Sequence, residues 1–246
     1  MMTIGILSGV WLTWFLAKKQ GIPTEVSISA AVWGVACGII GSRVSWALDP
    51  VNLGVWRHPT ELLAIQNGGM GWYGGLIGGS LAVVIYFWIK KLPLARFADA
   101  AAPSVILGLS IGRIGCTING DAAGTPTSLP WGFVYTNPNS FAPLWTATHP
   151  YPVYEILWNM VILVVLWRLW KRLSPDGSLL LVMLAAYSFG RFCLSFLKDE
   201  VSVLGPLHQS HIISLALFVF SVALLAYRKA RLVKPERAVA RDEVIP

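Results

Sequence analysis

The sequence has 246 residues, of which 55% are hydrophobic and only 13% are charged, and its mean hydropathy is +0.63. Soluble domains carry about 25% charged residues, so this composition disfavours a water-soluble enzyme, a nucleic-acid-binding module and a disordered chain. The net charge of +7 therefore indicates orientation in a membrane, with no nucleic acid as a partner.

Seven apolar runs are long enough to cross a bilayer as helices, which takes about 20 residues each and somewhat fewer for a short span. In chain order they cover about 3–17, 28–48, 71–89, 98–118, 152–170, 178–197 and 210–227. Runs of this length exceed ordinary strands, and membrane β-barrels show weaker, alternating segments. The sequence thus predicts an all-α integral membrane protein with seven transmembrane helices. The transmembrane domain covers 1–229, and a basic tail follows over 230–246.

Basic residues predict the orientation of these spans. Fourteen of the 19 Lys and Arg residues end or follow the first, third, fifth and seventh spans, whereas the opposite loops hold only Arg57 and Lys198. Because basic segments stay in the cytoplasm, we expect the N-terminus outside and the C-terminus cytoplasmic. The longest loop, about 119–151, has no Lys or Arg and is expected on the outer side. Its aromatic residues suit a cap over a site or a simple interfacial anchor.

Three arginines lie inside predicted spans, each in the outer half: Arg43, Arg113 and Arg191. An arginine at mid-membrane costs about 2.5–3.5 kcal/mol on insertion scales, and such residues usually mark functional sites. Three cations at one depth repel each other unless an anion lies among them. A phospholipid phosphate fits, because guanidinium groups hold phosphate bidentately. The alternative is that each arginine reaches the interface separately.

Glycines are concentrated in the second and third spans. Four-residue spacings such as Gly34/Gly38 and Gly74/Gly78 predict close helix packing in lipid. The run from Gly68 to Gly71 differs, because it precedes the third span on the outer side. There, glycine would let backbone donors reach a lipid headgroup or form a re-entrant turn.

Two polar segments lie at the outer ends of predicted spans. Residues 112–121 place Arg113, Asn119, Gly120 and Asp121 within ten residues at the end of the fourth span. Residues 149–155 begin the fifth span with prolines, which suit a helix start. For His149 and Glu155, at the two ends of that segment, helix capping and a catalytic role remain equally open. Glu155 could also neutralise one of the arginines.

The sixth and seventh spans contain one further pair of candidate site residues and no predicted metal site. Tyr187 and Arg191 are four residues apart, so one helical face carries both. His208 and His211 begin the seventh span without a companion cysteine or carboxylate. We therefore predict neither a metal site nor a cofactor.

Together, these strings resemble the prolipoprotein diacylglyceryl transferase family of bacterial membranes. Residues 112–121 resemble its signature G-R-I-G-N-F-I-N-G-E, and residues 68–79 resemble its segment G-G-M-S-F-H-G-G-L-I-G. Residues 41–43 resemble its G-A-R motif, residues 149–155 its H-P-S-Q-L-Y-E motif, and residues 187–191 its Y-x-x-x-R element. The likeness covers nearly the whole chain.

The resemblance implies transfer of the diacylglyceryl group of phosphatidylglycerol to the lipobox cysteine of preprolipoprotein signal peptides, at the bacterial plasma membrane. Arg113 and Arg191 would stabilise the departing phosphate, and Tyr73 stands where the family has a histidine that is a candidate base. The remaining predicted positions would bind substrate: Arg43, Gly69, Met70, Asn119, Gly120, Asp121, His149, Glu155 and Tyr187.

Several positions depart from the family pattern. Cys116 replaces an asparagine, Ser195 an acidic residue and Tyr73 the histidine, while the tyrosine before the family's first span has no counterpart. Tyrosine is a poor base at neutral pH unless a nearby cation favours its anion. Two interpretations follow: a divergent transferase, or a non-catalytic phospholipid-binding membrane protein with the same fold.

Overall fold

The structure is a computed structural model that describes residues 1–49, 52, 55, 60, 69, 71–170, 172–198, 202–204 and 207–242. These residues form seven helices of 18 residues or more and two short pairs of strands. The chain divides into two compact units, which are described separately. The α2–α4 unit is Trp14–Phe97, and the α5–α8 unit is Met1–Thr13 with Ala98–Pro246.

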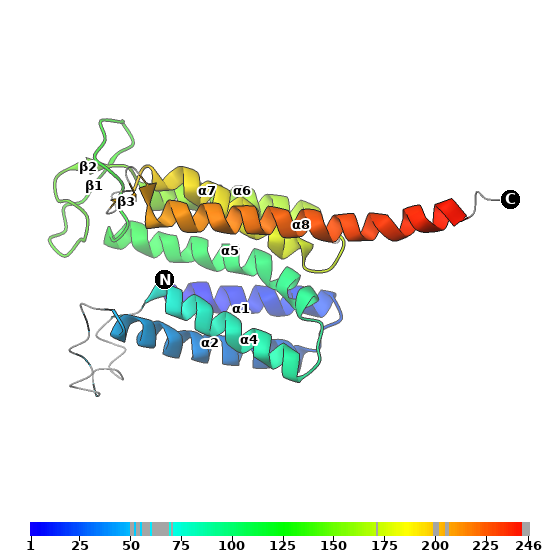
Figure 1. The fold of residues 1–246 in the computed structure, drawn as a ribbon. Helices are drawn as coiled ribbons and strands as arrows, with labels where there is room; N and C mark the ends of the chain where they lie inside the picture. The colour runs from blue at the N-terminus through cyan, green and yellow to red at the C-terminus, as the bar shows by residue number, and fades with distance from the viewer. Residues whose placement is uncertain are drawn as a thin grey trace. The chain divides into compact units, whose positions relative to one another are not determined.

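The α2–α4 unit is built on two helices that lie side by side, α2 (Thr24–Ala47) and α4 (Trp72–Ile89) (Figure 1). Glycines from both helices fill their interface. A Cβ atom on Gly78 would lie 2.6 Å from the carbonyl oxygen of Cys37, and one on Gly79 would lie 2.9 Å from that of Gly34. The predicted packing role of these glycines is confirmed, because side chains at these positions would force the helices apart.

The α5–α8 unit contains α5 (Leu94–Asn119, from residue 98), α6 (Tyr151–Leu169), α7 (Ser178–Ser195) and α8 (Gln209–Asp242) (Figure 1). Its apolar core joins the first three of these helices: Ala102, Ile106, Ile162, Leu166, Leu179 and Met183. The first part of α1 (Met2–Lys19) packs here too, since a Cβ on Gly5 would lie 2.9 Å from the carbonyl oxygen of Gly108.

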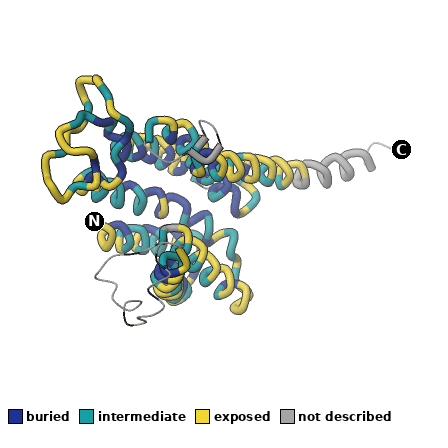
Figure 2. The backbone as a smooth tube through the Cα atoms, turned by 60° about the vertical axis from the view of Figure 1, so that its left-hand side comes forward, coloured by how far each residue is buried: buried dark blue, intermediate teal, exposed yellow. Residues whose placement is uncertain are grey.

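Residues 120–150, the α5–α6 loop, have a defined structure outside the helices. Strand β1 (Phe133–Val134) pairs antiparallel with β2 (Ala147–Thr148), with Phe133 opposite Thr148. The loop is joined to the segment just after α7, because the Thr125 amide donates to the carbonyl oxygen of Leu197 at 2.9 Å. Much of the loop surface is exposed (Figure 2). A second pair, β3 (Ser202–Leu204) and β4 (Leu207–His208), precedes α8.

The helices coincide with the seven predicted spans to within a few residues, apart from the C-terminal end of α8. Five of them are long and apolar enough to cross a membrane: α2, α5, α6, α7 and the part of α8 over Gln209–Ala230. In α4 the apolar stretch Tyr73–Ile89 is shorter. The prediction of a helical multi-pass membrane protein is therefore confirmed at the level of these five helices. The short strand pairs are an addition that the prediction of an all-α chain did not contain.

Candidate functional site

Two of the predicted arginines meet at one buried carboxylate in the α5–α8 unit. Glu155, in the second turn of α6, is only 4% exposed. Its Oε2 atom forms an ion pair with Nε of Arg113 on α5, and its Oε1 atom forms one with Nη1 of Arg191 on α7. Glu155 was expected to neutralise one arginine. It bridges both, and the three side chains are called the two-arginine cluster below.

Tyr151 completes this cluster from one turn earlier on α6. Its side chain is fully buried, and its hydroxyl accepts a hydrogen bond from Nη1 of Arg191 at 2.8 Å. The same hydroxyl donates to Oε1 of Glu155 at 3.3 Å. The guanidinium of Arg191 also lies 5.7 Å from the centre of the Tyr151 ring, a cation–π distance. Tyr151 therefore contacts the Arg191 side chain with both its hydroxyl and its ring.

The spacing of residues explains why these groups share one face. Tyr151 and Glu155 are four residues apart, as are Tyr187 and Arg191, and helical residues at this separation are neighbours. Tyr187 is close enough to Arg113 and Glu155 to interact with both. The predicted proximity of Tyr187 to an arginine is thus present, but the ring under Arg191 is that of Tyr151.

The charges of the cluster do not cancel. Two guanidinium groups and one carboxylate leave a net charge of +1, and the arginine side chains remain 21% and 20% exposed. Guanidinium groups carry five N–H donors each, so donors remain for another anion after the carboxylate is bound. The arrangement can therefore accept one phosphate group between two fixed cations.

The end of α5 is held to the α5–α6 loop close to the cluster. Thr117 donates from its hydroxyl to the carbonyl oxygen of Arg113 at 2.9 Å, and Tyr135 donates to the carbonyl oxygen of Thr117 at 3.0 Å. Burial raises the pKa of the Tyr135 hydroxyl, and Asp121 raises it further, so this donor stays protonated at neutral pH. Arg113 also lies 3.8 Å from the Cys116 sulfur.

Of the signature residues, Asn119, Gly120 and Asp121 form the junction between α5 and the loop. Asn119 and Asp121 are exposed, and the carbonyl oxygen of Asn119 accepts a hydrogen bond from the Ser140 hydroxyl at 3.2 Å. Gly120 has φ +73°, and a Cβ there would collide with Ser140 and approach the Tyr135 ring. Glycine is therefore needed for both the backbone conformation and the close contact.

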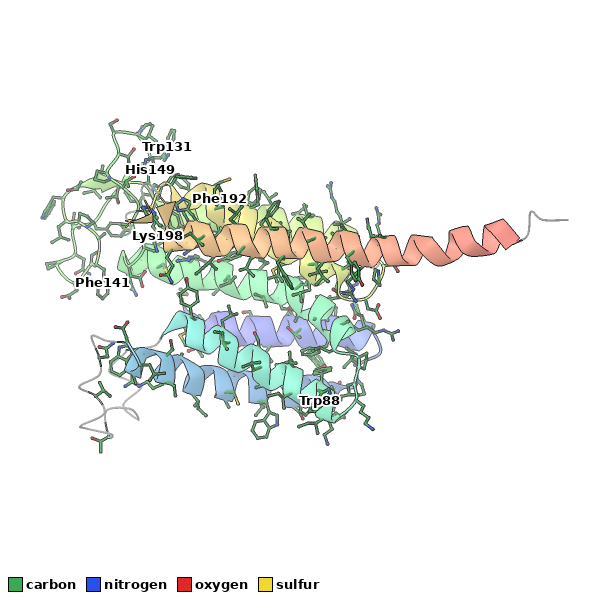
Figure 3. All side chains as sticks on the ribbon, viewed as in Figure 1. Trp88, Trp131, Phe141, His149, Phe192 and Lys198 are labelled. Carbon is green, nitrogen blue, oxygen red and sulfur yellow. The ribbon has the colours of Figure 1, made fainter. Side chains whose placement is uncertain are left out.

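His149 lies at the loop end of the α5–α8 unit and is partnered by aromatic residues. Its Nδ1 atom is 3.3 Å from the hydroxyl of Tyr154, which accepts a hydrogen bond from the Trp131 indole at 2.8 Å. Figure 3 shows His149 and Trp131 at this end, together with Lys198. The partner of His149 is thus Tyr154, whereas Glu155, one residue further on, belongs to the two-arginine cluster.

The third predicted arginine belongs to the α2–α4 unit. Arg43 is buried, donates from Nη1 to the carbonyl oxygen of Gly69 at 2.6 Å, and lies 4.4 Å from the centre of the Trp46 ring. Gly69 has φ +75°, and a Cβ there would lie 2.5 Å from the Trp46 ring. Two predicted substrate-binding residues, Arg43 and Gly69, are therefore in contact.

Two predicted residues flank the start of α4. Tyr73 is the second residue of that helix and is 45% exposed. Met70 lies outside the described residues. A common anion site for Arg43, Arg113 and Arg191 stays a prediction, as does the role of Tyr73.

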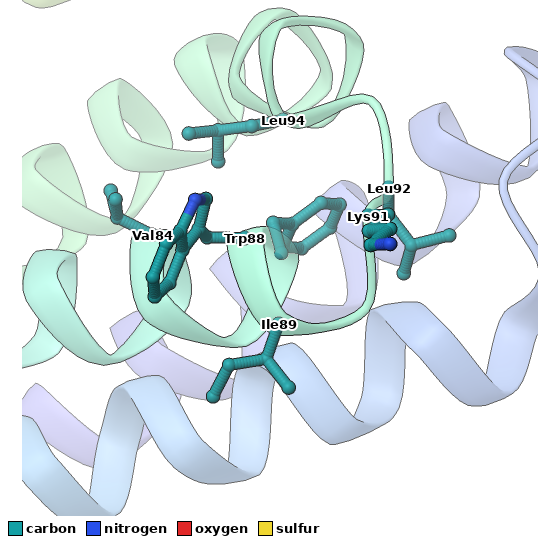
Figure 4. A pocket seen from close by; sticks show the side chains of 7 residues that line it. Val84, Trp88, Ile89, Lys91, Leu92 and Leu94 are labelled. Atoms are coloured by element: carbon teal, nitrogen blue, oxygen red, sulfur yellow. The ribbon is translucent and has the colours of Figure 1, made fainter.

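Two cavities lined by described residues are apolar. One of about 600 Å³ lies at the end of α4 furthest from Tyr73, where Trp88, Leu92 and Leu94 line it (Figure 4). The other, of about 510 Å³, lies between α7 and α8 beside His211 and Phe192. Neither cavity is lined by a predicted site residue.

Two residues of this site, Tyr151 and Tyr135, were not predicted as site residues from the sequence. Tyr151 could have been found from its spacing of four residues to Glu155. Tyr135 carries no such local signal, because it reaches Thr117 from 18 residues away through the fold of the loop.

The sequence is similar to known proteins over most of its length. The sequence pattern of the prolipoprotein diacylglyceryl transferase family matches residues 1–227. A phosphatidylglycerol–prolipoprotein diacylglyceryl transferase of Thermosynechococcus vestitus is 34% identical, over 87% of this chain and 81% of the relative. Proteins of the same name from Corynebacterium glutamicum and Clostridioides difficile are 33% and 30% identical, over 94% and 87% of this chain and 78% and 83% of the relatives. The chain belongs to the prolipoprotein diacylglyceryl transferase family.

Proposed function

We propose that this chain transfers the sn-1,2-diacylglyceryl group of phosphatidylglycerol to the lipobox cysteine of preprolipoprotein signal peptides. The products are a thioether-linked lipid and glycerol 1-phosphate. One observation carries the proposal: Arg113 and Arg191 are fixed on either side of buried Glu155, with a net positive charge.

The reaction moves charge toward such a cluster. The cysteine sulfur, as thiolate, forms a bond to the glyceryl carbon that carries the phosphate ester. The bond from that carbon to the ester oxygen breaks, its electron pair stays on the oxygen, and glycerol 1-phosphate leaves. A phosphodiester with one negative charge thus becomes a monoester with a second. Guanidinium groups already held in place by Glu155 and Tyr151 stabilise that charge without reorganising.

The thiol must also lose its proton, because the thiolate is the nucleophile. Tyr73, His149 and water in the field of the arginines are the candidate acceptors. We favour Tyr73, which stands in the glycine-rich segment at the position of the family's histidine. A hydroxyl there would also orient the phosphate while protonated.

The remaining substrate contacts follow from the same positions. Backbone groups around Gly69 and Met70 would face the headgroup, with Arg43 held beside them by its bond to Gly69. Lipid or peptide would also contact the junction between α5 and the α5–α6 loop, where Asn119 and Asp121 are exposed and Gly120 forms the turn. His149 and Tyr187 would complete the binding residues.

The proposed setting is the bacterial plasma membrane. Seven spans in residues 1–229 would place the N-terminus outside, with the basic tail over 230–246 in the cytoplasm, as the distribution of Lys and Arg predicts. The α5–α6 loop would then lie on the outer side, where the translocated lipobox cysteine arrives. Exposed Phe141 and Trp145 would contact the headgroup region of the outer leaflet.

A single reconstituted assay tests the proposal. Purified protein is mixed with phosphatidylglycerol vesicles and a lipobox peptide, and the peptide is examined by mass spectrometry. We expect a mass gain of one diacylglyceryl group on the cysteine, together with release of glycerol 1-phosphate. A peptide with serine in place of that cysteine serves as the control. Repeated absence of transfer, with phosphatidylglycerol bound to the protein, would instead support a non-catalytic lipid-binding protein.

A further inference from the structure

A carboxylate on α5 caps the start of α7. Asp99 is 8% exposed, and its two oxygens accept hydrogen bonds from the backbone amides of Gly177, at 2.6 Å, and Leu180, at 2.9 Å. Gly177 precedes α7 with φ +89° and, being glycine, has no side chain to cap the helix itself. Asp99, 78 residues earlier in the chain, supplies that cap from a different helix.

This contact ties two helices at one level. The first amides of a helix have no partner within the helix, and a negative charge there is favoured by the helix dipole. Hydrogen bonds also require a defined direction. Since both Asp99 oxygens are engaged, the first turn of α7 cannot slide along α5 without losing at least one of these bonds.

The spacing from this tie to the two arginines is the same on both helices. On α5, Arg113 follows Asp99 by 14 residues. On α7, Arg191 follows Gly177, the residue just before the helix, also by 14 residues. At 1.5 Å of rise per residue, each segment is about 21 Å long. The helices run in parallel from the tie, so both arginines arrive at one level, where Glu155 binds both.

Between the two ends, α5 and α7 share an apolar cluster to which α6 also contributes. Ala102 and Ile106 of α5 belong to one core cluster with Leu179 and Met183 of α7. The hydrophobic contribution of such contacts is non-directional, so the hydrogen-bonded tie is the stronger constraint on axial position. We propose that Asp99 is a positioning residue, which sets the register of α5 against α7 and so places Arg113 and Arg191 for the transfer reaction. This inference rests on the proposed function.

Two substitutions separate register from simple capping. Asp99→Glu keeps the charge and both oxygens but adds one methylene, comparable to the rise of one residue. Asp99→Asn keeps the length but loses the charge and one acceptor. If register matters, Asp99→Glu lowers kcat by about 10- to 100-fold, because small displacements of catalytic groups are costly, with KM for phosphatidylglycerol within about threefold. Asp99→Asn then retains more activity than Asp99→Glu. The opposite order overturns the proposal.

Met183→Ala is the matched control for loss of stability. Met183 is buried in the core cluster of α7 and takes no part in the tie or the two-arginine cluster. Its truncation is expected to lower the unfolding temperature while kcat stays near that of the parent. If Met183→Ala and Asp99→Glu lower kcat equally at matched unfolding temperatures, destabilisation explains the effect and the proposal fails.

A distance measurement tests the register without catalysis. The positions to be spin-labelled, once Cys37 is replaced by serine, are Cys116 on α5, which is half-buried, and Cys193 on α7, which is exposed. Asp99→Glu should shift the distance between the labels, whereas Met183→Ala should not. An unchanged distance in Asp99→Glu overturns the inference, as does a shifted distance with parental kcat. If the parent protein transfers no lipid at all, the proposed function fails, and the distance still decides the register.

Discussion

Glu155 lies between two cations at a position that is almost closed to solvent. Removing one member of a buried ion pair is far more costly than removing an exposed one, because the remaining charge is left uncompensated. The carboxylate therefore does two things at once. It makes two arginines compatible with a partly buried site, and it holds their side chains in fixed positions.

Replacing an arginine of the cluster should remove transfer while leaving the protein in the membrane. We expect Arg113→Ala and Arg191→Ala each to lower kcat/KM by about 100-fold or more, the cost of losing one preorganised donor to a developing anion. Arg113→Lys should also fail substantially, because a point charge cannot replace a guanidinium that contacts carboxylate and phosphate together.

The matched control is Arg168→Ala, which removes an exposed arginine at the far end of α6. It should transfer lipid at the parental rate in the peptide assay. Full activity of either alanine variant at Arg113 or Arg191 would contradict the proposal that these arginines stabilise the departing phosphate.

Neutralising the central carboxylate should affect both stability and activity. Glu155→Gln leaves two guanidinium groups without their counter-charge. We expect the free energy of unfolding to fall by about 3 kcal/mol or more, which is measured as a lower unfolding temperature in detergent. Transfer should fall as well, since the arginines lose their fixed orientation. Glu25→Gln, which changes an exposed carboxylate in the first turn of α2, should leave both properties unchanged.

The identity of the base is tested by removing one hydroxyl. Tyr73→Phe keeps the ring of this half-exposed residue, and we expect it to lose most of the transfer activity. His149→Gln should lose less, because the Nδ1 of His149 is directed to Tyr154 in the first turn of α6. The readout is the initial rate of peptide lipidation from pH 6 to 9. A Tyr73→Phe variant that follows the parental rate across this range contradicts the assignment.

At the scale of residues, the important side chains are easier to predict from the sequence than the contacts they make with one another. The two arginines and Glu155 stand out because charges are rare in apolar spans. That one carboxylate binds both arginines depends on contacts across 36 and 42 residues, which no local pattern encodes. The same limit applies to Asp99, whose capping role follows only from the packing of α5 against the start of α7.

At the scale of elements, the α2–α4 interface depends on the absence of side chains. We expect Gly78→Ala to lower the unfolding temperature, because the added Cβ would lie 2.6 Å from the Cys37 carbonyl oxygen, and overpacking costs about 1–3 kcal/mol. Gly75→Ala is the matched control on the same helix, since its nearest neighbour would be 3.3 Å away at Ser42. Equal stability of the two variants would contradict this account of the interface.

The helices could be placed from the sequence because long apolar runs leave few alternatives. Their ends were less predictable. The last run was expected to end near residue 227, but α8 continues to Asp242, because loss of hydropathy marks the exit from an apolar environment and not the end of a helix. The strands β1 and β2 contain two residues each, too few to show an alternating pattern.

At the scale of the whole molecule, the proposed orientation predicts which loops face outward. In a chain whose native cysteines are replaced, Asn139→Cys in the exposed α5–α6 loop should react with a membrane-impermeant thiol reagent in intact cells. Arg172→Cys, exposed between α6 and α7, should react only after the cells are permeabilised. Labelling in the reverse order would overturn the orientation, since it would place the loop in the cytoplasm.

The division of charges among α5, α6 and α7 also bears on how the protein is made. During synthesis, α5 would reach the membrane carrying Arg113 before its partner Glu155 on α6 had been translated, and Arg191 on α7 would follow last. An unpaired arginine in lipid costs about 2.5–3.5 kcal/mol even on insertion scales, which give the lowest values. These three helices would therefore leave the translocation machinery as a group, and a nascent chain that stops after α5 should remain associated with it.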